Sequence, residues 1–428
     1  PIGAGRPFVD IITHLESRSS EGLAKLSVSR RQSGGELVRA TSLPDVQLGS
    51  IFSGQPLPPG EDEVLASGET PADSERLRFV TWESASDLRE RIIEVIGSEL
   101  DASDDELERA VELSLGGTVS GDYIYFNHGC GQSAEEWQIL SAHRNMASGS
   151  SEINRLIKQT VRARRLEAAR RRGWGWRMIE PRGADQITYG DKVICLRNHP
   201  RKRWNPTDQK RDGYLANGEV GIVNGDAGKR PRWTKVEFAS QPTESYSFSS
   251  RDFSEEGSPF LELAYAVTVH KAQGSEFGTV ILVLPRGSQL LSREMLYTAL
   301  TRQRNRVWIL HQGPFSHFLK LRSNFFSETA RRSTNLFGMP AMRELTVHDV
   351  GGSRKGWLAE KLIHATRGGE LVSSKSEVFI ADALFEKAQA GTIRYSFEKP
   401  LIANGQYRLP DFTIEKATEV WYWEHCGL

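Results

Sequence analysis

The chain has 428 residues, and its 55 lysines and arginines balance its 55 aspartates and glutamates, which excludes a global field that would draw the protein onto nucleic acid. The length predicts about two to four domains, and the three cysteines form no CxxC pair, which argues against a disulfide framework or a zinc site. No apolar run approaches the roughly 20 residues of a membrane span, so we expect a soluble, cytoplasmic protein.

The first predicted elements surround a long connection. We expect a helix near residues 8–18, a connection rich in proline, glycine, serine and acids at 42–75, and an alternating strand at 76–82. A helix at 84–100 begins at Ser84, a favourable N-cap, and its apolar positions share one face: Leu88, Ile92, Val95 and Ile96.

A buried strand is predicted at 137–144, and its end carries the polar residues Ser141, His143 and Arg144. A capped helix follows at 148–160, and a basic helix at 154–172 keeps Ile157, Val161 and Leu166 roughly on one side. The arginines of the basic helix allow two interpretations. They form either a patch for backbone phosphates or a solvated helix face.

Short strands with turn glycines are predicted next, at 190–198, 217–223 and 232–238. Residues 199–214 mix arginine, lysine and tryptophan, and we expect a loop there. This set of short strands predicts a small β-domain, which carries no specific function by itself.

Polar side chains crowd into residues 264–277, between two apolar runs typical of strands: Thr268, His270, Lys271, Gln273, Gly274, Ser275 and Glu276. Packing alone rarely requires that, so a ligand is expected there. Residues 293–307 predict a helix that carries Arg302 and Arg304 at its end, where a fixed guanidinium can bind a phosphate in bidentate fashion. Together the two segments indicate nucleotide chemistry at the edge of an α/β sheet.

These two segments resemble motifs V and VI in the second motor domain of RecD-like superfamily 1 helicases, through T-x-H-K-x-Q-G-S-E-F and Y-T-A-L-T-R. The run SVSRRQ at 27–32 resembles motif IV, with Arg31 the better match and Arg30 the alternative. In these helicases the strands at 190–258, placed before motif V, correspond to a small SH3-like β-barrel inserted into the motor domain.

The resemblance implies a role for each matched residue. Arg302 would be an arginine finger on the γ-phosphate of ATP bound with Mg²⁺, and Arg31 a second clamp. Nucleotide contacts would come from Gln273, Gly274 and Glu276. Contacts to single-stranded DNA and duplex junctions would come from two groups: Thr268, His270 and Lys271, and Ser141, His143 and Arg144.

No phosphate-binding loop of the form G-x-x-x-x-G-K-[ST] occurs, since the nearest run, GDAGK at 225–229, lacks the spacing and the following Ser or Thr. The opening PIGAGRPF resembles the segment after helicase motif III. We therefore expect a fragment of a longer protein in which another motor domain supplies the rest of the ATP site, and no ATP hydrolysis by the fragment alone.

The last part predicts a helix at 355–366, a second helix at 374–385, a strand at 395–401, and a hairpin at 409–425. This pattern resembles the PD-(D/E)xK nuclease fold, which implies a site of Glu377, Asp411 and Glu424, with a Mg²⁺ ion held by Asp411 and Glu424. The chain departs from the family pattern because Cys426 stands where the motif lysine usually falls. Lys399, on the neighbouring strand, is the candidate substitute.

The expected fold class is therefore α/β, with a RecA-like parallel-sheet motor domain, a small inserted β-barrel, and an α+β restriction-endonuclease-like domain. The implied parts are the tail of a first RecA-like domain (1–25), a second RecA-like domain in two pieces (26–189 and 259–344), the barrel (190–258), and a linker with the nuclease-like domain (345–428). The main hypothesis is an ATP-driven DNA helicase with a nuclease-like module. The alternatives are a non-catalytic DNA-binding module and a magnesium-dependent nuclease.

Overall fold

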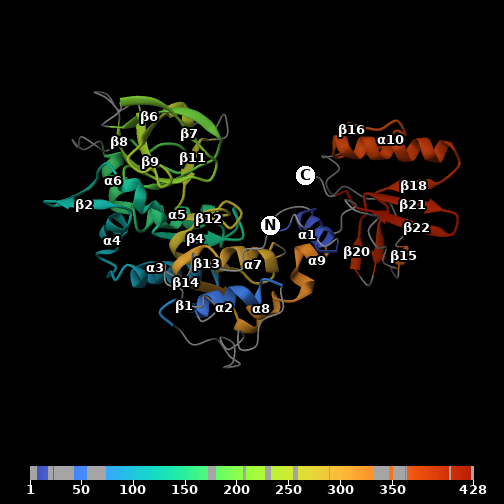
Figure 1. Cartoon of the computed structure of the whole chain (residues 1–428), viewed down its shortest axis with the longest axis horizontal. Helices are drawn as coiled ribbons and strands as arrows, with labels where there is room; N and C mark the ends of the chain where they lie inside the picture. Colours follow the sequence, from blue (N-terminus) through green and yellow to red (C-terminus); the bar gives the residue numbers. More distant parts are fainter. Residues whose placement is uncertain are drawn as a thin grey trace. The chain divides into compact units, whose positions relative to one another are not determined.

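A computed structural model gives the architecture of two compact units, each described here by itself (Figure 1). The residues described are 7–17, 23, 43–54, 74–171, 180–205, 209–226, 233–253, 259–288, 290–331, 347–349, 362, 364–403 and 406–425. The first unit covers the described residues from 23 to 331. The second covers those from 347 to 425 together with helix α1 (Pro7–Ser17), which confirms the helix predicted near 8–18. Within these described ranges no helix is long and apolar enough to cross a membrane.

A five-stranded parallel sheet forms the centre of the first unit, in the order β1-β14-β13-β4-β12. Every residue of β4 and β13 is buried, as expected where both faces of a parallel sheet are covered. The strands predicted at 76–82 and 137–144 are confirmed as β1 and β4. The five strands are β1 (Leu77–Trp82), β4 (Trp137–Ser141), β12 (Ala266–Thr268), β13 (Phe277–Leu284) and β14 (Gln303–Gln312).

Helix α3 (Ala85–Glu99) follows the sequence prediction closely. Ser84 is its N-cap and accepts a hydrogen bond from the backbone N–H of Asp87, and the four predicted apolar side chains are buried. The other helices of this unit are α2 (Pro44–Ile51), α4 (Leu107–Ser114), α5 (Ser150–Gln159), α6 (Ala163–Arg170), α7 (Arg293–Ala299), α8 (Phe315–Lys320) and α9 (Glu328–Arg331), with short 3₁₀ turns η3 (Cys130–Glu135), η4 (Ser250–Phe253) and η5 (Asn324–Phe326).

Helix α2 corrects the prediction that residues 42–75 are only a connection. Its Asp45 is fully buried and accepts hydrogen bonds from Arg76 Nε at 2.8 Å and from Gln303 Nε2 at 3.1 Å. The helix is held by long-range polar contacts to the starts of β1 and β14, and a local pattern of Pro, Gly and Ser gives no sign of such contacts.

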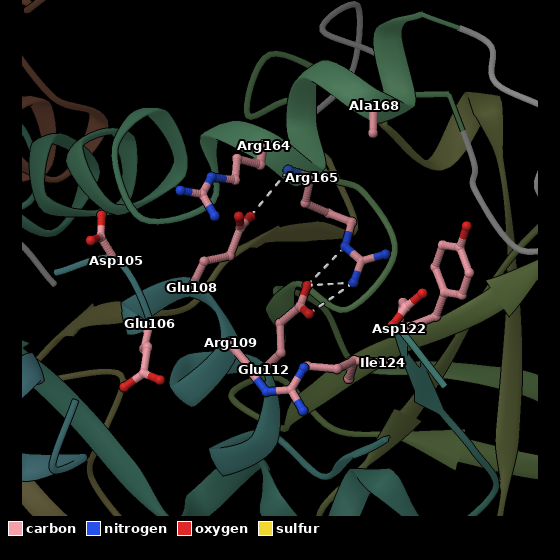
Figure 2. A pocket seen from close by; sticks show the side chains of 11 residues that line it. Asp105, Glu106, Glu108, Arg109, Glu112, Asp122, Ile124, Arg164, Arg165 and Ala168 are labelled. Atoms are coloured by element: carbon pink, nitrogen blue, oxygen red, sulfur yellow. Dashed lines mark hydrogen bonds and ion pairs between the residues drawn. The ribbon is translucent and has the colours of Figure 1, made fainter. Parts of the chain in front are cut away.

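The predicted basic helix is two helices, α5 and α6, and the break between them changes the role of its arginines. Arg162, at the break, has no exposed surface, and its Nη1 donates to Glu112 Oε1 at 2.5 Å. Arg165 donates to the same carboxylate of α4 from Nε and Nη2, both at 2.8 Å (Figure 2). At these two positions neither a phosphate patch nor a solvated face is found, because both side chains neutralise a buried glutamate.

Asp191 extends this buried network into the turn before the second sheet. Lys158 of α5 donates to its Oδ2, the Tyr265 hydroxyl donates to its Oδ1 at 2.8 Å, and Arg162 Nε lies 3.5 Å from Oδ1. Buried charges therefore join α4, α5, α6 and the two sheets of this unit. Replacing one partner leaves the others without compensation, which is costly in a low-dielectric interior.

Seven antiparallel strands form the second sheet, in the order β11-β5-β8-β9-β10-β6-β7. Strands are present at all three predicted places. The strands are β5 (Lys192–Cys195), β6 (His199–Asn205), β7 (Gln209–Leu215), β8 (Val220–Asp226), β9 (Trp233–Phe238), β10 (Ser245–Ser249) and β11 (Leu261–Leu263), and a separate hairpin is formed by β2 (Gly117–Ser120) and β3 (Tyr123–Phe126).

The loop predicted at 199–214 is instead the β6–β7 hairpin. Burial alternates along β6, but its partly buried positions carry arginine where an ordinary strand carries apolar residues. Arg201 pairs with Asp252 at 2.8 Å and lies 4.2 Å from the ring centre of Phe248, and Arg203 pairs with Glu244 at 2.6 Å. The sequence HPRKRWN shows no alternation of apolar and polar residues, because polar or charged residues occupy the inward positions.

The second unit packs helix α10 (Lys375–Gln389) on the sheet β18-β21-β22, with Ala381, Leu384 and Phe412 in the core. The predicted helix and hairpin are confirmed. The single strand predicted at 395–401 is two strands of different sheets, β18 and β19, and the described end of the helix predicted at 355–366 contains strand β16. The strands are β15 (Val347–Asp349), β16 (His364–Ala365), β17 (Leu371–Val372), β18 (Arg394–Phe397), β19 (Leu401–Ala403), β20 (Gln406–Arg408), β21 (Phe412–Lys416) and β22 (Glu419–Trp423).

Candidate functional site

In the first unit, the residues predicted from motifs V and VI lie at two opposite edges of the parallel sheet. Thr268, the last residue of β12, pairs with Ser141, the last residue of β4, at the carboxyl edge. Phe277, the first residue of β13, pairs with Gln303, the first residue of β14, at the amino edge. Residues 269–276 therefore run from the carboxyl edge to the amino edge, and one short segment touches both.

Arg302 lies at the amino edge, and its guanidinium is directed at the loop that contains Glu276. Its Nη1 donates to the carbonyl oxygen of Ser275 at 3.0 Å, and its Nε donates to the carbonyl oxygen of Thr298 at 2.9 Å. The predicted helix is shorter than expected: α7 ends at Ala299, so Arg302 is in the turn after it. Arg304 is exposed on strand β14.

The loop before β13 carries the other predicted nucleotide contacts. Gly274 has φ +96°, and a Cβ there would meet nothing within 4 Å, so a glycine is favoured by backbone conformation rather than by close packing. Gln273 is exposed and Glu276 is half-buried. Burial raises the pKa of the nearby Glu135, Lys192 and Arg304 oppose that effect, and Glu276 adds to it.

Lys192 is buried beneath this amino edge, and no sequence pattern singled it out. Its Nζ donates to the carbonyl oxygen of Trp137 at 2.5 Å and lies 5.8 Å from the ring centre of Phe277. Burial lowers the pKa of Lys192 to about 7, against the opposing charges of Glu135 and Glu136. Strand β5 of the seven-stranded sheet thus places a lysine amine against Trp137 of β4 and Phe277 of β13.

Replacing Lys192 with methionine is expected to change how stability depends on pH. Between pH 7 and its ordinary pKa of 10.5, this lysine is protonated in the unfolded chain and largely neutral in the folded one. The unfolded state binds more protons in this window, so Lys192 makes the free energy of unfolding rise with pH by up to about 1.4 kcal/mol per unit. Urea unfolding between pH 7 and pH 10 should show a shallower rise for Lys192→Met than for the wild type. The exposed Lys202→Met should show the same rise as the wild type. If Lys192→Met and the wild type show the same dependence on pH, Lys192 does not have a lowered pKa in the folded chain.

A pocket of about 240 Å³ lies at the carboxyl edge, and Arg144, Thr268 and Lys271 are among its lining residues. Both cations are paired with one acid of β11: Arg144 Nη2 donates to Glu262 Oε1, and Lys271 Nζ donates to Glu262 Oε2 at 3.2 Å. Three of the six predicted DNA contacts are thus brought together. Glu262 was missed because its partners are 118 and nine residues away in the chain.

The other three predicted DNA contacts have different environments. Ser141 is fully buried, and its hydroxyl donates to the carbonyl oxygen of Ser148 at 2.7 Å, so it shapes the loop and does not face solvent. His143 is also buried, its Nε2 has no hydrogen-bond partner in the described part of the chain, and burial lowers its pKa. His270 is exposed. The predicted clamp Arg31 lies outside the described residues.

In the second unit, Glu377 acts first as a helix cap. It accepts hydrogen bonds from the hydroxyls of Ser373 and Ser374, both at 2.8 Å, while its N–H donates to Ser374, the N-cap of α10. Burial acts in the opposite direction, yet these hydrogen bonds lower the pKa of Glu377. Its carboxylate also accepts a hydrogen bond from the backbone N–H of Ser373 at 2.9 Å, so capping of α10 accounts for its position.

The charges of the predicted nuclease-like residues act on one another in sequence, Glu377 on Asp411 and Asp411 on Glu424. Burial raises the pKa of Glu424, and the charge of Asp411 adds to this effect. Burial likewise raises the pKa of Asp411, which accepts a hydrogen bond from the backbone N–H of His425 at 2.5 Å. Across the described ranges, no group of three or more His, Cys, Asp or Glu side chains is arranged to hold a metal ion. Cys426 lies outside those ranges.

Comparisons with known proteins find similarity to helicases over the segment that contains the two edges. Residues 263–310 match the UvrD-like helicase C-terminal domain, and this segment contains both Thr268 and Arg302. Over 49 residues the chain is 60% identical to the ATP-dependent RecD2 DNA helicase of Deinococcus radiodurans. The aligned segment is 11% of this chain and 7% of that protein. Through this domain the chain is related to superfamily 1 DNA helicases.

Two further similarities extend over more of the chain. It is 27% identical to uncharacterized protein MJ1519 of Methanocaldococcus jannaschii over its full length, and spans 34% of that protein. A crystal structure of Pif1 helicase from Bacteroides in complex with ADP-AlF3 and ssDNA aligns with a TM-score of 0.20 and 14% identity, covering 66% of this chain and 62% of that one. A TM-score of 0.20 is too low to show a common fold. The chain thus spans about a third of protein MJ1519, and its match to the RecD2 helicase covers only a small fraction of that helicase.

Proposed function

We propose that this chain is the C-terminal motor part of an ATP-dependent DNA helicase or translocase. The observation that supports it is the separation of two charged sites on one sheet, joined by residues 269–276. Arg302 is held against Ser275 and next to Glu276 at the amino edge, and Arg144 and Lys271 line a pocket at the carboxyl edge. The matched UvrD-like segment contains the connecting residues and Arg302.

In this proposal Arg302 acts on a nucleotide that another domain holds. A guanidinium fixed by two backbone carbonyls is pre-organised, and it would stabilise negative charge on the transferring γ-phosphoryl group of ATP. Among the parts of an ATP site, the described residues supply this arginine. The sequence holds no phosphate-binding loop of the form G-x-x-x-x-G-K-[ST], and the described residues form no group of three or more His, Cys, Asp or Glu side chains for a metal ion; in this proposal the other domain would supply both.

The carboxyl-edge pocket would bind the backbone of single-stranded DNA. Lysine, arginine and a threonine hydroxyl contact phosphates without reading bases, which suits a protein that moves along any sequence. ATP binding and release at the amino edge would shift residues 269–276, and the same residues would then alter the grip of Thr268 and Lys271. The proposal includes a second RecA-like domain in two pieces (26–189 and 259–344), with a β-barrel between them (190–258) and a nuclease-like domain after them (345–428).

Nuclease activity is a second candidate for the C-terminal unit, favoured by the charge of Asp411, which adds to the effect of burial in raising the pKa of Glu424, and by the charge of Glu377, which acts in the same way on Asp411. Two neighbouring carboxylates can share a Mg²⁺ ion. Asp411→Asn in the full-length gene product, assayed for Mg²⁺-dependent cleavage of DNA, decides between an active and a degenerate nuclease-like unit.

The main proposal is tested with the full-length gene product. We expect ATP hydrolysis that is stimulated by single-stranded DNA and displacement of a labelled strand from a forked duplex. Hydrolysis without DNA stimulation, or none at all, would leave a DNA-binding module as the better description.

A further inference from the structure

Glu262 connects the two cations of the carboxyl-edge pocket, although it belongs to the seven-stranded sheet. Its strand β11 pairs with β5, and its own backbone is in register with Ile194. One carboxylate oxygen faces Arg144 Nη2 and the other faces Lys271 Nζ. A carboxylate that presents two oxygens to two cations occupies the place that two oxygens of a phosphate would take.

The pocket is electrically neutral as long as this arrangement holds. Arg144 and Lys271 contribute two positive charges, and Glu262 and Asp185 contribute two negative ones. Asp185 accepts a hydrogen bond from the backbone N–H of Leu263 at 3.0 Å, and burial raises its pKa. A neutral pocket attracts a polyanion weakly, so the predicted DNA contacts are masked.

The ion pairs of Glu262 are accessible enough to exchange. The side chains of Arg144, Lys271 and Glu262 keep 53%, 28% and 19% of their surface exposed. Partly exposed ion pairs contribute little to stability, so exchanging one acceptor for another costs little.

We propose that Glu262 is a built-in competitor of the nucleic acid, which occupies the phosphate position between Arg144 and Lys271 until a backbone phosphate of single-stranded DNA displaces it. The inference rests on the proposed DNA-binding function. It gives β11 a role in that function, because the acid that leaves the cations belongs to the seven-stranded sheet.

The test is the affinity of the full-length gene product for fluorescein-labelled oligothymidylate, measured by anisotropy at several salt concentrations. Glu262→Gln removes the competing charge and keeps the size of the side chain. We expect binding about 3- to 10-fold tighter than wild type, in line with the modest strength of such pairs. Glu262→Ala should show the same gain. Glu94→Gln, which breaks the exposed pair with Arg91 on α3, is the matched control and should leave the affinity unchanged.

A background without the two cations separates displacement from a general charge effect. In Arg144→Ala/Lys271→Ala, adding Glu262→Gln should give no gain, because the competition has no target. A gain that persists there, or unchanged affinity in Glu262→Gln and Glu262→Ala, overturns this inference while DNA binding itself stands. Failure of wild type and both Glu262 variants to bind the oligonucleotide at low salt overturns the proposed function as well.

Discussion

Replacing Arg302 with alanine in the full-length gene product is expected to lower the rate of DNA-stimulated ATP hydrolysis by about 10³- to 10⁵-fold, the range found for removal of arginine fingers. The guanidinium would act on charge that develops only in the transition state, so binding of a non-hydrolysable ATP analogue should change much less. Initial rates at saturating ATP and single-stranded DNA measure the first quantity, and equilibrium titration measures the second.

Arg302 also fastens the loop before β13, and the experiment must separate that role from catalysis. Arg302→Lys keeps a positive charge but cannot reproduce both backbone hydrogen bonds. Thermal unfolding and DNA binding of both variants report on the fold, and the exposed Arg322→Ala is the control. If the rate of ATP hydrolysis falls only as much as the fraction of folded protein does, Arg302 has a structural role and no catalytic one.

Glu112→Ala is expected to lower the free energy of unfolding by about 3–5 kcal/mol, the cost of leaving a buried charge without its partner. Arg162, with no exposed surface, would keep its ion pair with Asp191 at 3.5 Å, but Asp191 already pairs with Lys158. Urea unfolding of the chain monitored by tryptophan fluorescence measures the loss.

Two companion variants sharpen this second prediction. Glu152→Ala removes an exposed pair with Arg155 on α5 and should cost less than about 1 kcal/mol. Glu112→Leu combined with Arg162→Met replaces the buried ions with apolar groups and should recover much of the lost stability. If Glu112→Ala is as stable as Glu152→Ala, the buried network does not hold the two sheets together.

The local sequence patterns were sufficient to predict an element where one of its faces is apolar and a capping or turn residue marks its start. The face of α3, its cap at Ser84, the buried strand at 137–141 and the hairpin of β21 and β22 were all predicted, because each depends on residues close together in the chain. The patterns failed at the β6–β7 hairpin and at Arg162. There arginines occupy inward positions that a pattern of apolar residues cannot reveal.

The sequence by itself singled out the candidate site residues: the polar run from Thr268 to Glu276 and Arg302 are both evident from the order of residues along the chain. Only the tertiary structure decided that these residues divide between two edges of a parallel sheet, because strand register sets which ends lie together. The tertiary structure also decided which charged side chains are paired with each other. Glu262 and Glu112 reach their arginines across many intervening residues, and electrostatic pairing depends on distance in space rather than along the chain.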